Sequence, residues 1–190
     1  MRVGVLAVQG AVREHLEALR RIGVEAAPVR LPEEVVASDA LIIPGGESTT
    51  IGKLMVRYGL LEPVKEVARA GKPLLGTCAG MILMAKRIEA AGEDQPRLGL
   101  MDITVERNAY GRQVDSFEAD LPVKGIDSGP VRGVFIRAPV IRSVGDGVEV
   151  LAIHDGRIVA ALQGRLLALA FHPELTADPR LHRYFLSLAG

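Results

Sequence analysis

Short apolar runs alternate with helix-spaced segments over the first half of the chain. Residues 3–8 (VGVLAV) are apolar throughout, and residues 11–23 (AVREHLEALRRIG) are apolar at every third or fourth position until Gly23. The first pattern is typical of a buried strand, and the second is typical of an amphipathic helix that ends at a glycine. The chain therefore opens with a strand followed by a helix.

The same alternation continues to residue 88. Apolar runs at residues 24–30, 40–46 and 72–76 predict strands, and residues 48–59 and 79–88 have helical spacing. Strands that are apolar along their whole length are buried on both faces, as in parallel sheets. We therefore predict an α/β fold in three layers, with a mostly parallel central sheet and helices on both faces.

The pattern changes from about Leu98 onward. Short apolar runs are now separated by turn sequences such as GDG and HDG, which predicts antiparallel hairpins added to the sheet in the C-terminal half. A helix over residues 178–189 closes the chain, with Asp178 as its N-cap and Pro179 at its first position. The predicted strands are residues 101–107, 133–139, 148–154, 157–163 and 166–172.

Composition limits the cellular and functional classes. The 190 residues are 48% hydrophobic with a formal net charge of +0, so a single domain over residues 1–190 is expected. The one cysteine excludes an internal disulfide, and the absence of a signal-peptide pattern makes the cytoplasm the expected location. No apolar run reaches the ~20 residues of a membrane span, and 23 basic residues balance 23 acidic ones, which argues against nucleic-acid binding.

The single cysteine, Cys78, lies where a predicted strand turns into a predicted helix. Gly76 and Gly80 flank it at the G-x-nucleophile-x-G spacing of a strand-to-helix elbow, where small residues allow close backbone approach. The helix N-terminus would favour a thiolate. A buried, inert cysteine explains the same position equally well, so spacing alone leaves both interpretations open.

The segment FHPEL supplies a candidate base and its acceptor. Pro173 favours extended backbone at His172, and side chains two apart in an extended segment point the same way, so His172 and Glu174 are expected to face one pocket. A thiolate nucleophile needs such a base, and the base needs an orienting group. Without Cys78, a strand end with a solvated Glu174 would be the simpler interpretation. The other histidines fit surface or packing roles better: His15, His154 and His182.

The segment IIPGGESTTI is a second glycine-rich turn after a strand. The backbone N–H groups of Gly45 and Gly46 would face the same site, where one of them and the N–H of Ala79 suit an oxyanion hole. The segment lacks the lysine and the spacing of a phosphate-binding loop, and no G-x-G-x-x-G follows the first strand. Nucleotide binding is therefore not expected.

Together GTCAG, PGGES and HPE resemble the motifs of the class I glutamine amidotransferases, whose glutaminase domain carries a Cys-His-Glu triad on a sheet of this kind. Within that class, VLAVQGAVREHLEAL, PGGESTTI and GTCAGMILMAK are similar to the glutaminase subunits of pyridoxal 5′-phosphate synthases, and the likeness runs from Val3 to the last helix. Many other members of the class have Gln three residues after the nucleophile, where this chain has Met81. The resemblance favours the reactive interpretation of Cys78.

The resemblance implies roles for individual residues. It makes Cys78 the nucleophile, His172 the general base and acid, and Glu174 the carboxylate that orients the base. It implies an oxyanion hole from the N–H groups of Gly46 and Ala79. The implied glutamine-binding residues are Gly46, Glu47, Ser48, Arg107, Ile136 and Arg137.

The resemblance also implies a partner. Glutamine would be hydrolysed to glutamate and ammonia, and the ammonia would pass to a synthase subunit, a (β/α)₈ barrel that makes pyridoxal 5′-phosphate, in a 12+12 assembly. The chain itself would need no cofactor and no metal. We expect the synthase to raise the rate of glutamine hydrolysis by turning an N–H of Gly45 or Gly46 inward. The candidate partner contacts are Gln9, Gly10, Arg13 and His15.

Two other function classes remain open from the sequence. A cysteine hydrolase of the same fold, acting on γ-glutamyl peptides or as a peptidase, would keep the triad and need no partner. A binding or chaperone-like module would keep the fold and the thiol without turnover. Assays with glutamine alone and with the synthase distinguish all three.

Overall fold

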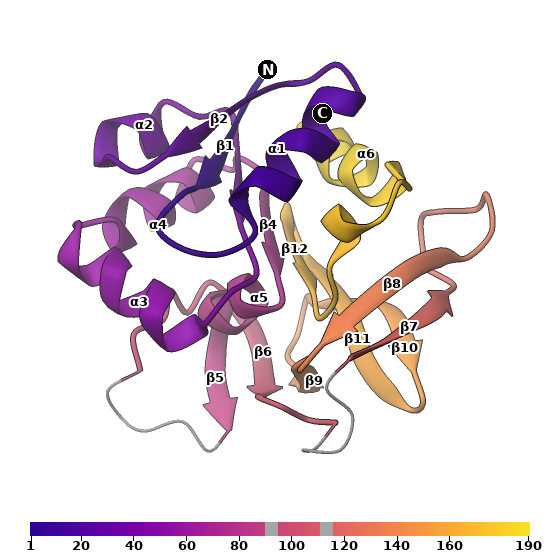
Figure 1. Cartoon of the computed structure of the whole chain (residues 1–190). Coiled ribbons are helices and arrows are strands. Elements are labelled where there is room, and N and C mark those ends of the chain that lie inside the picture. The colour runs from indigo at the N-terminus through magenta and orange to yellow at the C-terminus, as the bar shows by residue number, and fades with distance from the viewer. Residues whose placement is uncertain (90–94, 111–115) are drawn as a thin grey trace.

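The computed structural model describes residues 1–89, 95–110 and 116–190. Within these residues a ten-stranded sheet runs through the centre, and helices pack against both of its faces (Figure 1). The strands of this sheet are β1 (Arg2–Leu6), β2 (Glu25–Val29), β3 (Ala40–Ile43), β4 (Leu74–Thr77), β5 (Ala85–Glu89), β6 (Met101–Glu106), β9 (Val140–Val144), β10 (Glu149–His154), β11 (Arg157–Gln163) and β12 (Leu166–Leu169).

The strand order explains the layers. The strands β2, β1, β3, β4 and β12 are parallel neighbours, and β11, β9 and β6 continue the sheet in antiparallel pairs. The connection from β1 to β2 runs toward one edge, whereas the connection from β2 to β3 returns past β1. Right-handed crossovers in opposite directions place their helices on opposite faces. The predicted fold, with antiparallel strands added in the C-terminal half, is confirmed.

The helices form two groups (Figure 1). The first contains α1 (Val12–Arg21) and α6 (Arg180–Ser187). The second contains α2 (Pro32–Val36), α3 (Ser48–Arg57), α4 (Leu61–Arg69) and α5 (Ala79–Met84), of which α2 packs on α4 and α3 on α5. The helix α6 begins one residue later than predicted, so its N-cap is Pro179 rather than Asp178, although Asp178 Oδ1 accepts the Arg180 N–H at 3.0 Å.

One predicted helix is too long. The helix expected over residues 79–88 ends at Met84, because Ala85 takes extended backbone (φ −65°, ψ 143°) and starts β5. A short, continuously apolar segment fits either a helix or a strand from its pattern alone. The parallel pairing of β5 with β6 decides the outcome, and it depends on residues more than ten positions away.

The C-terminal hairpins are partly as predicted. The HDG turn joins β10 to β11, with Asp155 and Gly156 both at positive φ, as this type of hairpin turn requires. The GDG turn does not form a hairpin of its own, because the strands beside it, β9 and β10, each pair with β11. The strand predicted at residues 133–139 forms as β8 (Val131–Ile136), but it pairs with β7 (Ser116–Leu121) in a separate two-stranded sheet.

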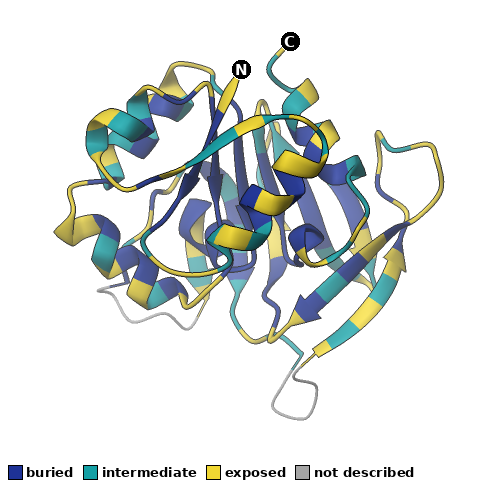
Figure 2. Ribbon diagram, turned by 45° about the horizontal axis from the view of Figure 1, so that its top comes forward, coloured by how far each residue is buried: buried dark blue, intermediate teal, exposed yellow. Residues whose placement is uncertain are grey.

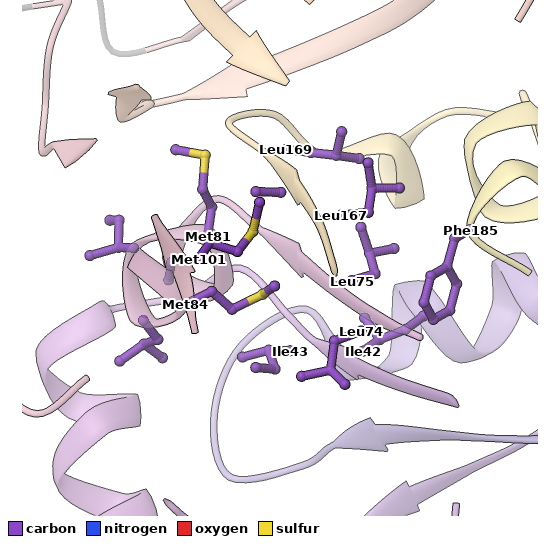
Figure 3. Close-up of a cluster of buried hydrophobic side chains, with 14 of the residues drawn as sticks. Ile42, Ile43, Leu74, Leu75, Met81, Met84, Met101, Leu167, Leu169 and Phe185 are labelled. Atoms are coloured by element: carbon purple, nitrogen blue, oxygen red, sulfur yellow. The ribbon is translucent and has the colours of Figure 1, made fainter. Parts of the chain in front are cut away.

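The hydrophobic core surrounds the central strands of the sheet. The central strands β3 and β4 are buried along their whole length (Figure 2). Helices from both faces add side chains to this core, and each buried aliphatic or aromatic side chain contributes about 1.5–3 kcal/mol. Figure 3 labels Ile42, Ile43, Leu74, Leu75, Met81, Met84, Met101, Leu167, Leu169 and Phe185 among them. No helix in the described part of the chain is long and apolar enough to cross a membrane.

Candidate active site

A cavity of about 600 Å³ lies where the parallel strands β3 and β4 reach their carboxyl ends. Ligands of open α/β sheets bind at this edge, and the volume is in the range of small-molecule sites. The structure brings most of the predicted site residues together here. Those that line the cavity are Gly46, Glu47, Ser48, Cys78, Arg107, Ile136, Arg137 and His172.

Cys78 occupies a strained elbow between β4 and α5. Its φ of 48° and ψ of −102° are unusual for a residue with a side chain, and such strain is typical of functional sites. The flanking glycines are explained by contact: a Cβ on Gly80 would collide with the Ile43 carbonyl oxygen, and one on Gly76 would meet Met84 Sδ at 2.5 Å. The close approach predicted for these glycines is therefore confirmed.

His172 and Glu174 form a direct hydrogen bond, with 2.7 Å between Nδ1 and Oε1. The predicted extended segment is wrong, because Pro173–Leu175 forms a 3₁₀ turn, and this turn brings the two side chains together. The backbone N–H of His172 donates to the Val134 carbonyl oxygen at 2.9 Å, which joins the segment to β8. His172 and Cys78 both line the cavity, and Glu174 lies behind the imidazole with no exposed side-chain surface.

The electrostatics favour a charged imidazole. Burial opposes the charged form, but hydrogen bonds and opposite charges at Cys78 and Glu174 raise the pKa of His172 to about 10. Burial likewise opposes ionisation of Glu174, but His15 and His172 hold its pKa below the usual value. The arrangement therefore suits an imidazolium held against the Glu174 carboxylate.

Two further histidines lie behind this pair. His15 of α1 is fully buried, so the expectation that it contacts a partner protein is wrong, whereas the packing role expected as one alternative for His15 and His182 is confirmed. The His15 Nδ1 lies 3.2 Å from His182 Nε2, and its Nε2 lies 3.2 Å from Thr77 Oγ1 and 3.5 Å from Glu174 Oε2. Helix packing, rather than the local sequence, directs both histidines to the interior.

The glycine loop after β3 is held from three sides. The Gly45 N–H donates to Thr77 Oγ1 at 3.0 Å, and the Gly45 carbonyl oxygen accepts the Ala11 N–H at 3.0 Å. The Glu47 N–H donates to Gln9 Oε1 at 2.9 Å. A Cβ on Gly45 would collide with the His172 ring, which explains why a residue without a side chain stands beside the base.

Arg107 is positioned by two neighbours in the cavity wall. Its Nη1 donates to Gln95 Oε1 at 2.8 Å, and its Nη2 lies 3.7 Å from Glu47 Oε1. Gln95 is buried and also donates to Ser48 Oγ at 3.2 Å. Despite partial burial, hydrogen bonds from Thr50 and from the first turn of α3 lower the pKa of Glu47 to about 2. Glu47 therefore stays an anion that orients the guanidinium.

Strained backbone also marks the opposite wall. Arg137 has φ 42° and Asn108 has φ 51°, and both residues line the cavity. Ile136 is 38% exposed despite its apolar side chain. Ala79 does not line the cavity, but it is the first residue of α5, where the backbone N–H has no partner within the helix.

The described residues contain no cluster of three or more His, Cys, Asp or Glu side chains that could hold a metal ion.

Known proteins are similar to this chain in sequence and in fold. Residues 5–189 match the model of the SNO glutamine amidotransferase family. The chain belongs to this family. Two relatives named pyridoxal 5′-phosphate synthase subunit PdxT come from Geobacillus kaustophilus and Herpetosiphon aurantiacus. The first is 60% identical over 99% of this chain and 94% of its own, and the second is 62% identical over 99% and 100%.

Solved structures agree with the assignment to the SNO glutamine amidotransferase family. A crystal structure of a glutamine amidotransferase is 58% identical, covers 99% of this chain and 98% of its own, and matches with a TM-score of 0.94. The PurLQS structure from Thermotoga maritima covers 100% of this chain and 99% of its own with a TM-score of 0.77, but at 20% identity it supports the fold alone. The family predicted from GTCAG, PGGES and HPE is confirmed.

Sequence reasoning about this SNO family member missed several side chains at the site. Gln95 lies in a segment that looks like a polar turn, so nothing in the sequence indicates its contacts with Ser48 and Arg107. A weak signal existed for His15, which lies four residues before the buried Leu19 on the apolar face of α1.

Proposed function

We propose that the chain hydrolyses L-glutamine to glutamate and ammonia, with Cys78 as nucleophile, His172 as general base and acid, and Glu174 as the orienting carboxylate. The observation that carries the proposal is the His172–Glu174 hydrogen bond of 2.7 Å beside a strained cysteine in one cavity. Membership of a glutamine amidotransferase family supports the choice of substrate. The proposal treats residues 1–190 as one glutaminase domain.

Each step uses groups that are present in the cavity. The Cys78 thiolate attacks the side-chain amide carbon of glutamine, and the carbonyl oxygen becomes an oxyanion. The C–N bond then breaks, and the leaving nitrogen takes a proton from His172 Nε2, because Nδ1 is occupied by Glu174. In the second half, His172 takes a proton from water, the water oxygen attacks the thioester, and the C–S bond breaks to release glutamate and the thiolate.

The backbone supplies the proposed oxyanion donors. The N–H groups of Gly46 and Ala79 are the candidates, since Gly46 lies in the glycine loop and Ala79 is the first residue of α5. Each donor aimed at the developing oxyanion contributes about 3 kcal/mol to transition-state stabilisation. The helix N-terminus adds a favourable dipole for the same charge.

The glutamine α-carboxylate is proposed to bind at the cavity wall that carries Arg107. The Arg107 guanidinium would pair with the α-carboxylate through two parallel hydrogen bonds, in an orientation set by Gln95 and Glu47. The Glu47 side chain caps α3, so its proposed contact with glutamine is through the backbone. The remaining proposed contacts are Gly46, Ser48, Ile136 and Arg137.

The ammonia acceptor is proposed to be a synthase subunit, a (β/α)₈ barrel that makes pyridoxal 5′-phosphate in a 12+12 assembly. The relatives are named as subunits of a pyridoxal 5′-phosphate synthase, which supports a partner of this kind. Gln9 and Gly10 line the cavity, and Arg13 lines a neighbouring surface hollow together with them, so the three remain candidate contacts. The proposal assigns no cofactor to this chain.

We further propose that the partner switches hydrolysis on through the glycine loop. The Gly45 carbonyl oxygen points at the Ala11 N–H, and in a trans peptide the following Gly46 N–H points the opposite way. Rotation of this one peptide would exchange the two directions. One misdirected oxyanion donor lowers the rate by about 10²–10³, which is enough to make the free chain appear inactive.

The test measures ammonia release from glutamine by the chain alone, with the synthase subunit, and with an unrelated barrel protein. We expect little release alone, a large increase with the synthase and none with the unrelated barrel. In the presence of synthase, Cys78→Ala and Cys78→Ser should release no ammonia while keeping the wild-type circular dichroism spectrum.

Each alternative predicts a different result. Full activity of the isolated chain, unchanged by synthase, would refute the switch and favour a self-sufficient hydrolase. Glutamine binding without turnover under all conditions would favour a binding module. Substantial turnover by a folded Cys78→Ala protein would remove the nucleophile assignment.

A further inference from the structure

The carboxylate of Glu174 has one oxygen that the triad does not use. Oε1 pairs with His172, whereas Oε2 is buried without a hydrogen-bond partner among the described residues. A buried, unpaired carboxylate oxygen is costly, so the group that faces it is of interest. That group is His15, whose Nε2 lies 3.5 Å from Oε2, and both side chains have no exposed surface.

The hydrogen-bond pattern of the two buried histidines indicates which nitrogen of His15 carries the proton. His182 Nδ1 is buried without a partner, and His182 Nε2 lies 3.2 Å from His15 Nδ1. An unpaired acceptor is tolerated better than an unpaired N–H, so His182 carries its proton on Nε2 and donates it to His15 Nδ1. A neutral His15 then has its own proton on Nε2, directed at Thr77 Oγ1 and Glu174 Oε2.

We infer that His15 is a positioning residue for the catalytic triad: its Nε2–H holds Glu174 Oε2, and His182 holds His15 in the tautomer that this contact requires. The inference rests on the proposed glutaminase function and deepens it. The carboxylate is thereby held through both oxygens, by His172 at Oε1 and by His15 of α1 at Oε2, and His182 of α6 holds His15 in place.

The charged groups around His15 are consistent with a neutral donor. Burial lowers the pKa of His15, and the nearby His172 lowers it further, whereas Glu174 and Glu14 act in the opposite direction. Burial also lowers the pKa of His182 to about 4, and His15 and Arg21 add to that effect, against Glu174. Both histidines therefore stay neutral near pH 7, and the negative charge remains on Glu174.

The test compares two substitutions at one position in the holoenzyme with synthase. His15→Leu removes the donor, whereas His15→Gln carries an amide N–H that can reach the place of Nε2. We expect His15→Leu to lower kcat about tenfold, the loss of one hydrogen bond to a charged group, with KM unchanged. The alkaline limb of kcat/KM should move to lower pH by about one unit, because a loosened Glu174 stabilises the imidazolium less. His15→Gln should restore most of kcat and return the alkaline limb toward its wild-type pH.

A second readout needs neither glutamine nor synthase. Cys78 is the only cysteine in the chain, so its alkylation by iodoacetamide reports the thiolate of the triad alone. The rate of alkylation at neutral pH should fall in His15→Leu and recover in His15→Gln. His154→Leu is the matched control, because His154 stacks on Phe117 and Phe135 outside the network, and it should leave the rate unchanged.

The outcomes separate this inference from the proposed function. Wild-type kcat, pH profile and alkylation in a folded His15→Leu protein would overturn the role of His15. If His15→Leu fails to fold, His182→Leu takes its place, with the same shifts expected at smaller size and a wild-type profile counting against the inference. If the wild-type complex releases no ammonia, the proposed function fails, and the alkylation rates still decide whether His15 acts on the triad.

Discussion

At the scale of single residues, the site depends on side chains that cannot be replaced without disturbing a neighbour. Cys78 holds positive φ, and the glycines around it leave no room for a Cβ. Gly45 stands so close to His172 that a methyl group there would occupy the position of the ring. These contacts join the segments that follow β3 and β4 with the segment that carries His172. The site is therefore built from residues that are far apart in the chain.

Substitutions of the proposed base and of its carboxylate should lower kcat by different amounts. Glu174→Gln keeps an oxygen that can accept from His172 Nδ1, whereas His172→Asn removes the proton carrier, so Glu174→Gln should retain more synthase-stimulated kcat. The alkaline limb of the Glu174→Gln profile should also move below its wild-type position, because the carboxylate charge no longer supports the imidazolium. Steady-state kinetics from pH 6 to 10 measure both effects. A wild-type rate in His172→Asn would exclude His172 as the base.

At the scale of elements, the loop before α1 supports the glycine loop after β3. Gly10 has φ 109°, and a Cβ there would collide with the Gly45 carbonyl oxygen. The Ala11 N–H donates to that same oxygen, so the two loops are in direct contact. A change at the start of α1 is therefore expected to reach the oxyanion donors without touching the triad.

A pair of glycine substitutions tests this coupling. Gly10→Ala should lower synthase-stimulated kcat at least tenfold, because it displaces the loop that carries Gly46. Gly23 also has positive φ (74°) but nothing within 4 Å of its Cβ position, so Gly23→Ala should cost about 1 kcal/mol of stability and leave kcat unchanged. Urea unfolding and the ammonia assay give the two quantities. Equal kcat in both variants and wild type would refute the coupling of the loops.

At the scale of the whole molecule, buried histidines make stability depend on pH. The pKa of His182 falls from 6.5 to about 4 on folding, so below pH 6.5 the unfolded chain binds the proton first and becomes favoured. This change in pKa corresponds to roughly 3 kcal/mol of stability, which is lost as the pH falls from 6.5 toward 4. His15 acts in the same direction. The raised pKa of His172 has the opposite sign, and its contribution is lost as the pH rises from 6.5 through about 10.

Unfolding between pH 4.5 and 7.5 tests the acid side of this dependence. His182 alone should lower the free energy of unfolding by about 2 kcal/mol as the pH falls from 7.5 to 4.5, and His172 opposes part of this fall. His182→Gln cannot titrate and should flatten the slope. The lower limit of pH 4.5 keeps most of the Glu174 contribution outside the window, because that contribution is lost mainly below the unfolded-state pKa of 4.5. An unchanged slope in His182→Gln would contradict the assignment.

The fold and the reactive centre could be predicted from the sequence because their determinants are local. Apolar runs and helical spacing decide which face of each strand and helix is buried, and the elbow around Cys78 needs only residues 76–80. His172 and Glu174 are two positions apart, so almost any turn that buries both brings them together, and the 3₁₀ turn did so where an extended segment was predicted.

Only the tertiary structure decided the rest, because those contacts join residues far apart in the chain. His15 and His182 meet across 167 positions, and Gln95 reaches Ser48 across 47. The segment after Met84 became a strand because β6 was available to pair with it, and β8 left the main sheet because β7 paired with it instead. Local sequence sets the preference of each segment, but the partner that satisfies its backbone and buried polar groups is chosen by packing.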